Sequence, residues 1–387
     1  MVIIICRDGR CRAGSNPPAL DVLNPMRPRP PKPGAKRIAT EAVHGGPDFA
    51  ELARLGLDPA TILDFSTNVN PFHRPSARLR EVLAGVPPHL HPDPRALELR
   101  QALADLLGIG PEKILAGNGS GELIWLTALA FLRVGDRALI VGPTYDEYAR
   151  AVRLMGAVPH HCLGRAEAGY HVAPGDVARA LADVRPRVVF VCNPNNPTGQ
   201  SHPLGAVRAW SEARRDALFV VDESYWEFGP REGTAIDLGA DNVLVLRSMT
   251  KAHGLAGLRL GFGVGHAAVV EAMRRAAPPW SVNAPAQAAG VVVMAERERL
   301  AQSLSELARA KPSLVDGLAS LGRAPLPSAT HFFLVHVGDG AATREALLRR
   351  GILVRDCASF GLPEFIRLST QTQDANARLL ATIKEIC

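Results

Sequence analysis

The feature that most constrains this chain is a single lysine, Lys251, in a turn rich in hydroxyl groups and glycine. The turn follows the apolar run 243–246, and Ser248 and Thr250 precede the lysine by three and one residues. Arg259 follows the lysine by eight residues. Hydroxyl groups and a guanidinium around one amine suit a ligand that carries both a phosphate and an aldehyde. Pyridoxal phosphate is such a ligand, and proteins usually attach it through a Schiff base to a lysine.

Two further apolar runs end in residues that this ligand needs. The run 188–192 leads into a turn of asparagine, proline and glycine that presents Asn196, and the next apolar run ends at Asp222. A carboxylate at a strand end can pair with a protonated ring nitrogen, and the cationic ring then stabilises a carbanion. We expect Asn196 and Tyr225 to hydrogen-bond to the phenolic oxygen of the ring. Asp222 could instead be only a helix N-cap, but that alternative does not explain Asn196 and Lys251 in the same order.

From about His44 to its C-terminus, the chain resembles the fold-type I pyridoxal phosphate enzymes of the aspartate aminotransferase superfamily. The resemblance rests on the lysine turn, the asparagine turn and the strand that ends at Asp222. It implies a homodimeric enzyme in which Lys251, Asp222 and Tyr225 are catalytic. It also implies a set of cofactor-binding residues: Ser120, Gly121, Glu122, Tyr145, Asn196, Asp222, Tyr225, Ser248, Thr250, Lys251, Arg259 and His91.

A glycine-rich segment, 118–122, accounts for part of that set because it precedes an apolar helix. Free backbone N–H groups and the helix dipole attract an anion, so we expect the cofactor phosphate here, beside Arg259. Tyr145 matches the family's aromatic residue that stacks on the pyridine ring. His91 stands where relatives carry a tyrosine that reaches the cofactor phosphate of the partner subunit. His331 likewise replaces an asparagine that is usual in the family.

Two arginines near the C-terminus predict a substrate with two anionic groups. Arg367 matches the superfamily's arginine for the substrate carboxylate, and Arg355 would be the second cation that a phosphate ester requires. Asp356 adjoins Arg355, but alternation along a strand should direct Asp356 to the opposite face. The resemblance implies that a phosphorylated amino acid or amine contacts His44, Gly45, Asn68, Asn196, Arg355 and Arg367.

Two branches of the superfamily fit these residues. Segments 44–46, 64–71 and 279–284 resemble the threonine-phosphate decarboxylases. They favour decarboxylation of O-phospho-L-threonine to aminopropanol phosphate in cobalamin biosynthesis. Segments 251–257 and 359–363 are closer to the histidinol-phosphate aminotransferases, so transamination with 2-oxoglutarate is the alternative. A non-catalytic, cofactor-binding regulator is a distant third interpretation, because the N-terminal tail is too short and too rich in proline to be a DNA-binding domain.

Continuous apolar strands that alternate with amphipathic helices predict an α/β fold of the aspartate aminotransferase type. We expect a mostly parallel sheet covered by helices, and a smaller α+β C-terminal domain. The predicted parts are a disordered, basic, proline-rich extension (1–40), an N-terminal arm that contributes to the small domain (41–75), a large cofactor-binding domain (76–278) and a small domain (279–387).

Charge and cysteine content limit the partners of the protein. The net charge is +6, but residues 1–38 carry eight lysines and arginines against two aspartates, so the rest of the chain is neutral. We therefore expect no nucleic-acid partner. The six cysteines show no paired spacing, which predicts a reducing cytoplasm and no metal site. No apolar run is long enough for a membrane span, and the apolar residues 2–5 are too few for a signal peptide.

Overall fold

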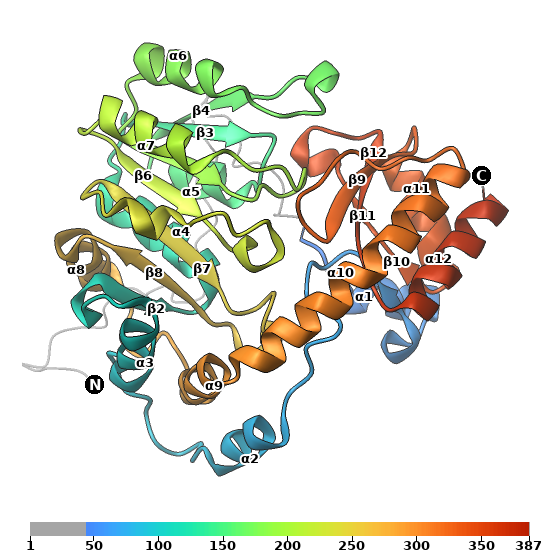
Figure 1. Cartoon of the computed structure of the whole chain (residues 1–387), viewed down its shortest axis with the longest axis horizontal. Coiled ribbons are helices and arrows are strands. Elements are labelled where there is room, and N and C mark those ends of the chain that lie inside the picture. Colours follow the sequence, from blue (N-terminus) through green and yellow to red (C-terminus); the bar gives the residue numbers. More distant parts are fainter. Residues whose placement is uncertain (1–43, 387) are drawn as a thin grey trace, which may run out of the picture. The chain divides into compact units, whose positions relative to one another are not determined.

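A computed structural model describes residues 44–386, and the predicted extension 1–40 lies outside the described residues (Figure 1). The largest element is a seven-stranded sheet with the order β2-β8-β7-β6-β5-β3-β4. All neighbouring strands in it are parallel except β8, which is antiparallel to both β7 and β2. This confirms the predicted α/β fold. The strands are β2 (Ile114–Gly117), β3 (Arg137–Gly142), β4 (Val158–Leu163), β5 (Val188–Cys192), β6 (Leu218–Asp222), β7 (Val243–Ser248) and β8 (Gly261–Gly265).

Helices cover both faces of this sheet because its central strands are apolar on both sides. Along β5, Val188 and Phe190 pack in one core, whereas Val189 and Val191 pack in another. The first core includes side chains from α4, α5 and α8, and the second includes side chains from α6 and α7. The helices of the large layer are α2 (Ala77–Gly85), α3 (Leu97–Leu107), α4 (Gly119–Phe131), α5 (Glu147–Leu154), α6 (Pro174–Val184), α7 (Leu204–Ala213), α8 (Ala267–Ala276) and α9 (Ala284–Ala295).

A smaller antiparallel sheet, with the order β11-β12-β9, lies among the C-terminal elements (orange and red in Figure 1). A two-stranded parallel sheet accompanies it, in which β1 pairs with β10. This pairing supports the proposal that the segment before residue 75 is an arm of the small domain. The elements are α1 (Phe49–Leu55), β1 (Leu63–Asp64), α10 (Arg297–Ser320), β9 (Phe332–His336), α11 (Gly340–Leu348), β10 (Ile352–Leu353), β11 (Arg355–Asp356), β12 (Phe365–Ser369) and α12 (Gln373–Ile386).

The strand order of the large sheet brings the predicted site residues together. Strands β5, β6 and β7 are parallel neighbours, so their carboxyl ends meet at one edge of the sheet. Asn196 follows β5, Asp222 ends β6, and Lys251 follows β7. None of the helices between residues 44 and 386 has the length and apolar character that crossing a membrane requires.

Strand β8 and the start of α4 approach so closely that a glycine is needed between them. A Cβ atom on Gly261 would lie 2.6 Å from the backbone nitrogen of Ser120 and 2.8 Å from the carbonyl oxygen of Arg247. Real Cβ contacts are almost never that short, and both neighbours are backbone atoms. Gly261 therefore fixes where the first turn of α4 lies.

We predict that Gly261→Ala lowers the free energy of unfolding by about 1–3 kcal/mol, because the added methyl group overpacks this contact. Urea denaturation would measure the loss. Gly257→Ala is the matched control, since nothing lies within 4 Å of a Cβ atom there. Equal stability of the two variants would contradict the prediction.

Candidate functional site

Lys251 lies in a cationic environment in the turn after β7. The backbone nitrogen of Asn70 donates to the Lys251 carbonyl oxygen over 3.0 Å, which ties the turn to the N-terminal arm. Burial first, and then the charges of Arg367 and Arg259, lower the pKa of Lys251 to about 8, against a smaller opposing effect of Asp64. The side chain nevertheless keeps some exposed surface. Lys251 can therefore be an uncharged, reachable nucleophile near neutral pH.

Asp222 is a buried carboxylate that neutral hydrogen-bond donors hold in place. The Tyr148 hydroxyl donates to Oδ2 over 2.7 Å, and the Ser224 backbone nitrogen donates to Oδ1 over 2.9 Å. Burial raises the pKa of Asp222, although both hydrogen bonds act against this rise. Among the described residues, Asp222 has no cation within ion-pair distance. A protonated ring nitrogen would supply the missing positive charge.

The start of α4 forms an anion site together with Arg259. Gly119 has a left-handed backbone (φ +77), and a Cβ atom there would lie 2.8 Å from Nη2 of Arg259. Arg259 also has a left-handed backbone (φ 59), and its guanidinium lies against the first turn of the helix. Ser224 donates to Ser120 over 3.1 Å between the two hydroxyl oxygens. These groups suit a phosphate at the helix start.

The other predicted phosphate ligands offer hydroxyl or backbone N–H groups that could bind a phosphate. The hydroxyl oxygens of Ser248 and Thr250 are 2.7 Å apart, and both residues are buried. A Cβ atom on Gly121 would meet nothing within 4 Å, which leaves open space above the helix start. The side chain of Glu122 accepts a hydrogen bond from the Asn118 backbone nitrogen over 2.7 Å. Because that carboxylate caps the helix, only the backbone N–H of Glu122 is suited to an anion.

Tyr145 lies between the large sheet and the N-terminal arm. Its ring centroid is 5.8 Å from that of His44 and 5.8 Å from that of Tyr148. Burial raises the pKa of the Tyr145 hydroxyl, and nearby Glu147, Tyr225 and Asp222 raise it further. The Tyr145 ring therefore packs beside Tyr148, whose hydroxyl bonds to Asp222.

Arg367 joins the two sheets at the substrate end of the site. It is buried on β12 and donates to the side-chain oxygen of Asn196 and to the carbonyl oxygen of Ser66. Its Nε has no hydrogen-bond partner among the described residues. Asn68 is also buried, and both atoms of its side-chain amide lack a standard hydrogen bond there, although the amide lies beside the Tyr225 hydroxyl. Unused polar groups of this kind indicate a place for a polar ligand.

Arg355 lies opposite Arg367 in the register of β11 and β12. Its Nη2 donates to the Ser359 hydroxyl over 2.6 Å, and its Nη1 donates to Oδ2 of Asp356 over 3.3 Å. The prediction that Asp356 faces away from Arg355 is therefore wrong. The Arg355 side chain is long enough for its Nη1 to reach both the carbonyl oxygen and the carboxylate of Asp356, which alternation of the Cβ atoms along β11 does not prevent.

The N-terminal arm brings His44 near Arg355. Gly45 lies directly on the Ser66 carbonyl group, where no side chain would fit, and the Gly46 nitrogen donates to the Ser66 hydroxyl over 2.7 Å. Nε2 of His44 is 3.6 Å from Oε1 of Glu147. Burial lowers the pKa of His44 more than Glu147 raises it, so the imidazole is neutral at pH 7.

His91 does not join the cluster around Lys251 through any contact in the described residues. It is exposed and stacks on Trp280, with ring centroids 4.6 Å apart and an interplanar angle of 20°. Its expected role at the site of a partner subunit therefore stays a prediction.

Three residues that support the site were not identified as site residues from the sequence. Tyr148 supports Asp222, Ser66 links Gly46 to Arg367, and Glu147 meets His44. Tyr148 could have been identified only as a member of an apolar helix face. Ser66 and Glu147 depend on contacts between segments that lie far apart in the sequence.

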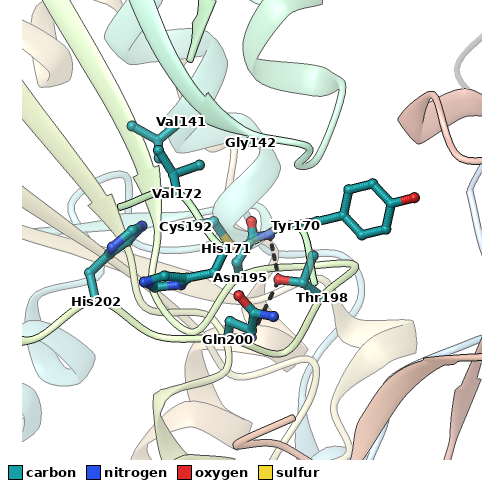
Figure 2. A pocket seen from close by; sticks show the side chains of 10 residues that line it. All are labelled: Val141, Gly142, Tyr170, His171, Val172, Cys192, Asn195, Thr198, Gln200 and His202. Atoms are coloured by element: carbon teal, nitrogen blue, oxygen red, sulfur yellow. Dashed lines mark hydrogen bonds between the residues drawn. The ribbon is translucent and has the colours of Figure 1, made fainter. Parts of the chain in front are cut away.

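Three cavities are lined in part by residues of this region. One, of about 10 Å³, lies beside the asparagine turn (Figure 2), where Asn195 and Gln200 both bond to the Thr198 hydroxyl. It has room for about one water molecule, so it belongs to the support of the turn. A second, of about 520 Å³, is lined in part by Ser248. The third has a volume of about 760 Å³, and its lining includes His44 and Arg355, which the sequence predicts to contact the substrate.

His331 generates a prediction about acid stability. Its buried ring lies 4.0 Å from that of Phe228 between ring centroids, and burial, with the charge of Arg367 next, lowers its pKa to about 3. Between pH 6.5 and about pH 3, the unfolded chain therefore binds a proton that the folded chain does not. Stability should fall as the pH falls through this window, by up to about 1.4 kcal/mol per pH unit for this residue.

We expect His331→Phe to remove that contribution to the slope. Urea denaturation between pH 6 and pH 4 would measure it, with His89→Phe as a control at an exposed position. A slope unchanged from that of the unaltered protein would contradict the assignment.

Comparison with known proteins agrees with this geometry. The sequence model of the family "Aminotransferase class I and II" matches residues 60–383. Histidinol-phosphate aminotransferase 1 of Thiobacillus denitrificans is 36% identical, over 88% of this chain and 90% of that protein. The crystal structure of a histidinol-phosphate aminotransferase from Sinorhizobium meliloti in complex with pyridoxal-5'-phosphate has a TM-score of 0.78 at 25% identity, over 87% of this chain and 94% of that one.

The structure of L-threonine-O-3-phosphate decarboxylase from Porphyromonas gingivalis is also similar, with a TM-score of 0.74 at 26% identity, over 83% of this chain and 98% of that one. The family match spans most of the chain, including every strand of the large sheet. The chain therefore belongs to the class I and II aminotransferases and is an enzyme that depends on pyridoxal phosphate.

Proposed function

We propose that this enzyme is an aminotransferase that exchanges an amino group between a phosphorylated amine and a 2-oxo dicarboxylic acid, as a histidinol-phosphate aminotransferase does. The observation that carries the proposal is the pair of buried arginines, Arg355 and Arg367, which are register partners on β11 and β12, with the charge of Arg367 acting on Lys251. Two guanidinium groups suit a substrate with two separated anions, or one anion and a polar group. The relative with 36% identity over 88% of the chain is named for this reaction.

Decarboxylation of a phosphorylated amino acid is the second candidate, and it is the reaction that the sequence favours. The observation in its support is the docking of the 44–46 segment on Ser66, which places His44 near Arg355. A decarboxylase structure is also among the similar ones. The similarity in sequence nevertheless supports transamination better, because relatives at 32–36% identity are named histidinol-phosphate aminotransferases, whereas the decarboxylase is a structural neighbour.

The site fits pyridoxal phosphate at each of its functional groups. Lys251 would hold the aldehyde carbon, and the buried carboxylate of Asp222 would pair with the ring nitrogen. Tyr225 and the free amide N–H groups of Asn196 would hold the phenolic oxygen, because Asn196 uses its side-chain oxygen for Arg367. When bound, the cofactor supplies a cationic ring that stabilises negative charge on the substrate carbon. The remaining contacts are the phosphate ligands Ser120, Ser248, Thr250 and Arg259, and the stacked ring of Tyr145.

Transamination additionally needs a group that moves a proton. Lys251 can take the proton from the substrate α-carbon at its Nζ atom and return it, because its lowered pKa leaves part of the amine unprotonated at neutral pH. Arg367 would hold the substrate so that this carbon faces Lys251. Decarboxylation breaks the bond to the carboxylate and needs no proton removed from that carbon. Transamination does need that step, so a base at Lys251 supports the proposed reaction.

We also propose that the working unit is a homodimer. The exposed stack of His91 on Trp280 supports this, because two aromatic rings that lie together at the surface suit a contact with another chain. The left-handed backbone of Trp280 (φ 56) holds its ring in this exposed position. His91 would then reach the cofactor phosphate of the partner subunit.

Replacement of the lysine tests the cofactor assignment. Lys251→Ala should abolish turnover, and the yellow colour of the bound cofactor should be lost or altered, because no other described lysine is part of the cluster around Asp222. In the unaltered enzyme, borohydride reduction and peptide mapping should place the cofactor on Lys251. Lys113→Ala, at an exposed position, is the control and should keep colour and activity. Label on another lysine would contradict the assignment.

One assay distinguishes the two reactions. With histidinol phosphate and 2-oxoglutarate, the enzyme should form glutamate, and O-phospho-L-threonine should release no carbon dioxide. The expected result follows from a base at Lys251 and an anion site that must accept a dicarboxylate. If carbon dioxide is released from O-phospho-L-threonine and no glutamate forms, the proposal is wrong and the decarboxylase stands.

A further inference from the structure

We infer that Asp356 sets how strongly the Arg355 site prefers a doubly charged anion over a singly charged one. The inference rests on the proposed function, because an aminotransferase must accept a phosphate ester and a dicarboxylate in turn at one site. The two ligands differ at the group farthest from the reacting carbon, which is a phosphate in one and a carboxylate in the other. A single arginine has to bind both groups and release both.

The guanidinium of Arg355 is fixed on several sides. Its Nη1 donates to the Asp356 carbonyl oxygen over 2.8 Å and to Oδ2 of the same residue over 3.3 Å. Its Nη2 donates to the Ser359 hydroxyl over 2.6 Å. The Phe360 ring lies below it, 5.2 Å from Cζ to the ring centroid. Arg355 is therefore positioned before any ligand arrives, and a negative charge is part of its surroundings.

The Asp356 carboxylate has one structural contact and one electrostatic contact. Its Oδ1 accepts a hydrogen bond from the Ala358 backbone nitrogen over 3.2 Å, which caps the turn 358–360. Its Oδ2 faces Arg355. The residue is half-buried and lines the cavity of about 760 Å³, together with His44 and Arg355. An anion that enters this cavity to reach Arg355 therefore also meets the Asp356 charge.

The charges of the two ligands decide what Asp356 does to each. A phosphate monoester carries about −1.5 to −2 charges near pH 7, whereas a carboxylate carries one. The repulsion free energy between a fixed negative charge and the phosphate is therefore about twice that between the same charge and the carboxylate. Asp356 therefore weakens the binding of the phosphate ester more than that of the dicarboxylate. Without it, the site would favour the phosphorylated ligand over the 2-oxo acid by a further factor of about five.

Four of the other ionisable residues that line this cavity form two ion pairs with each other. Arg344 forms two hydrogen bonds with the carboxylate of Glu51, and Arg349 pairs with Glu345 over 2.6 Å. These pairs lie on α1 and α11, whereas Asp356 lies on the strand that carries Arg355. Glu345 therefore offers a second carboxylate in the same cavity that is not bonded to Arg355.

The test uses Asp356→Asn, in which the amide oxygen can still cap Ala358 while the charge is gone. The probes are succinate and 3-phosphonopropionate, which share a skeleton and differ only in one anion, and neither has an amino or oxo group that could react. Isothermal titration of the holoenzyme at pH 8 would give both dissociation constants. A unit charge about 4 Å away in a water-like medium is worth roughly a factor of five in affinity.

We therefore expect Asp356→Asn to lower the dissociation constant of succinate by about fivefold and that of 3-phosphonopropionate by about 25-fold. The ratio of the two dissociation constants should then change by about fivefold. Asp356→Ser, whose hydroxyl can also accept from Ala358, should give the same change if the asparagine variant folds poorly. Glu345→Gln is the matched control and should leave the ratio within about twofold, because screening weakens the effect of an exposed, paired charge.

Equal changes for the two probes in both Asp356 variants would overturn the inference, as would an equal shift of the ratio in Glu345→Gln. These outcomes are separate from those of the reaction assay. If glutamate forms but the ratio does not change, only the role of Asp356 fails. If the ratio changes but no glutamate forms, the proposed reaction fails and the charge effect at Arg355 stands.

Discussion

The parallel pairing of β5, β6 and β7 is the constraint on which the rest of the site depends. Each strand is buried along its length, and the register places Cys192 beside Asp222 and Asp222 beside Leu246. The three turns that follow therefore begin at the same edge of the sheet. A shift of one residue in any of these pairings would exchange the faces of the strand and move its turn away from the other two.

Arg367 extends this arrangement from the large sheet to the small one. It is rooted in β12, yet it donates to Asn196 after β5 and to Ser66 in the N-terminal arm. One buried guanidinium thus connects three segments that are distant in the sequence. In the proposed function, the same guanidinium would also bind the substrate carboxylate, so one residue would be both a scaffold contact and a ligand-binding group.

Sequence alone predicts the parts of the site that depend on local patterns. The ends of apolar strands identify Asp222 and Lys251, because strand length and turn composition are local properties. The contact between Arg355 and Asp356 could not be predicted, because a long arginine side chain can reach the next residue although successive Cβ atoms alternate. The bond between Tyr148 and Asp222 joins residues 74 positions apart and has no local signal. The preference for decarboxylation rested on short segments, whereas the similarity along the chain favours transamination.

Gly45 fixes the position of the N-terminal arm against Ser66. Because its Cα lies against the carbonyl group of Ser66, the arm is held at the same atom that accepts a bond from Arg367. The arm and Arg367 therefore share one reference point at the Ser66 carbonyl oxygen. The same arginine bonds to Asn196 after β5, and Asn70 of the arm bonds to the Lys251 carbonyl oxygen, so the arm is coupled to both turns that are proposed to hold the cofactor. A substitution that moves the arm can therefore alter the choice of substrate and the position of the reacting lysine together.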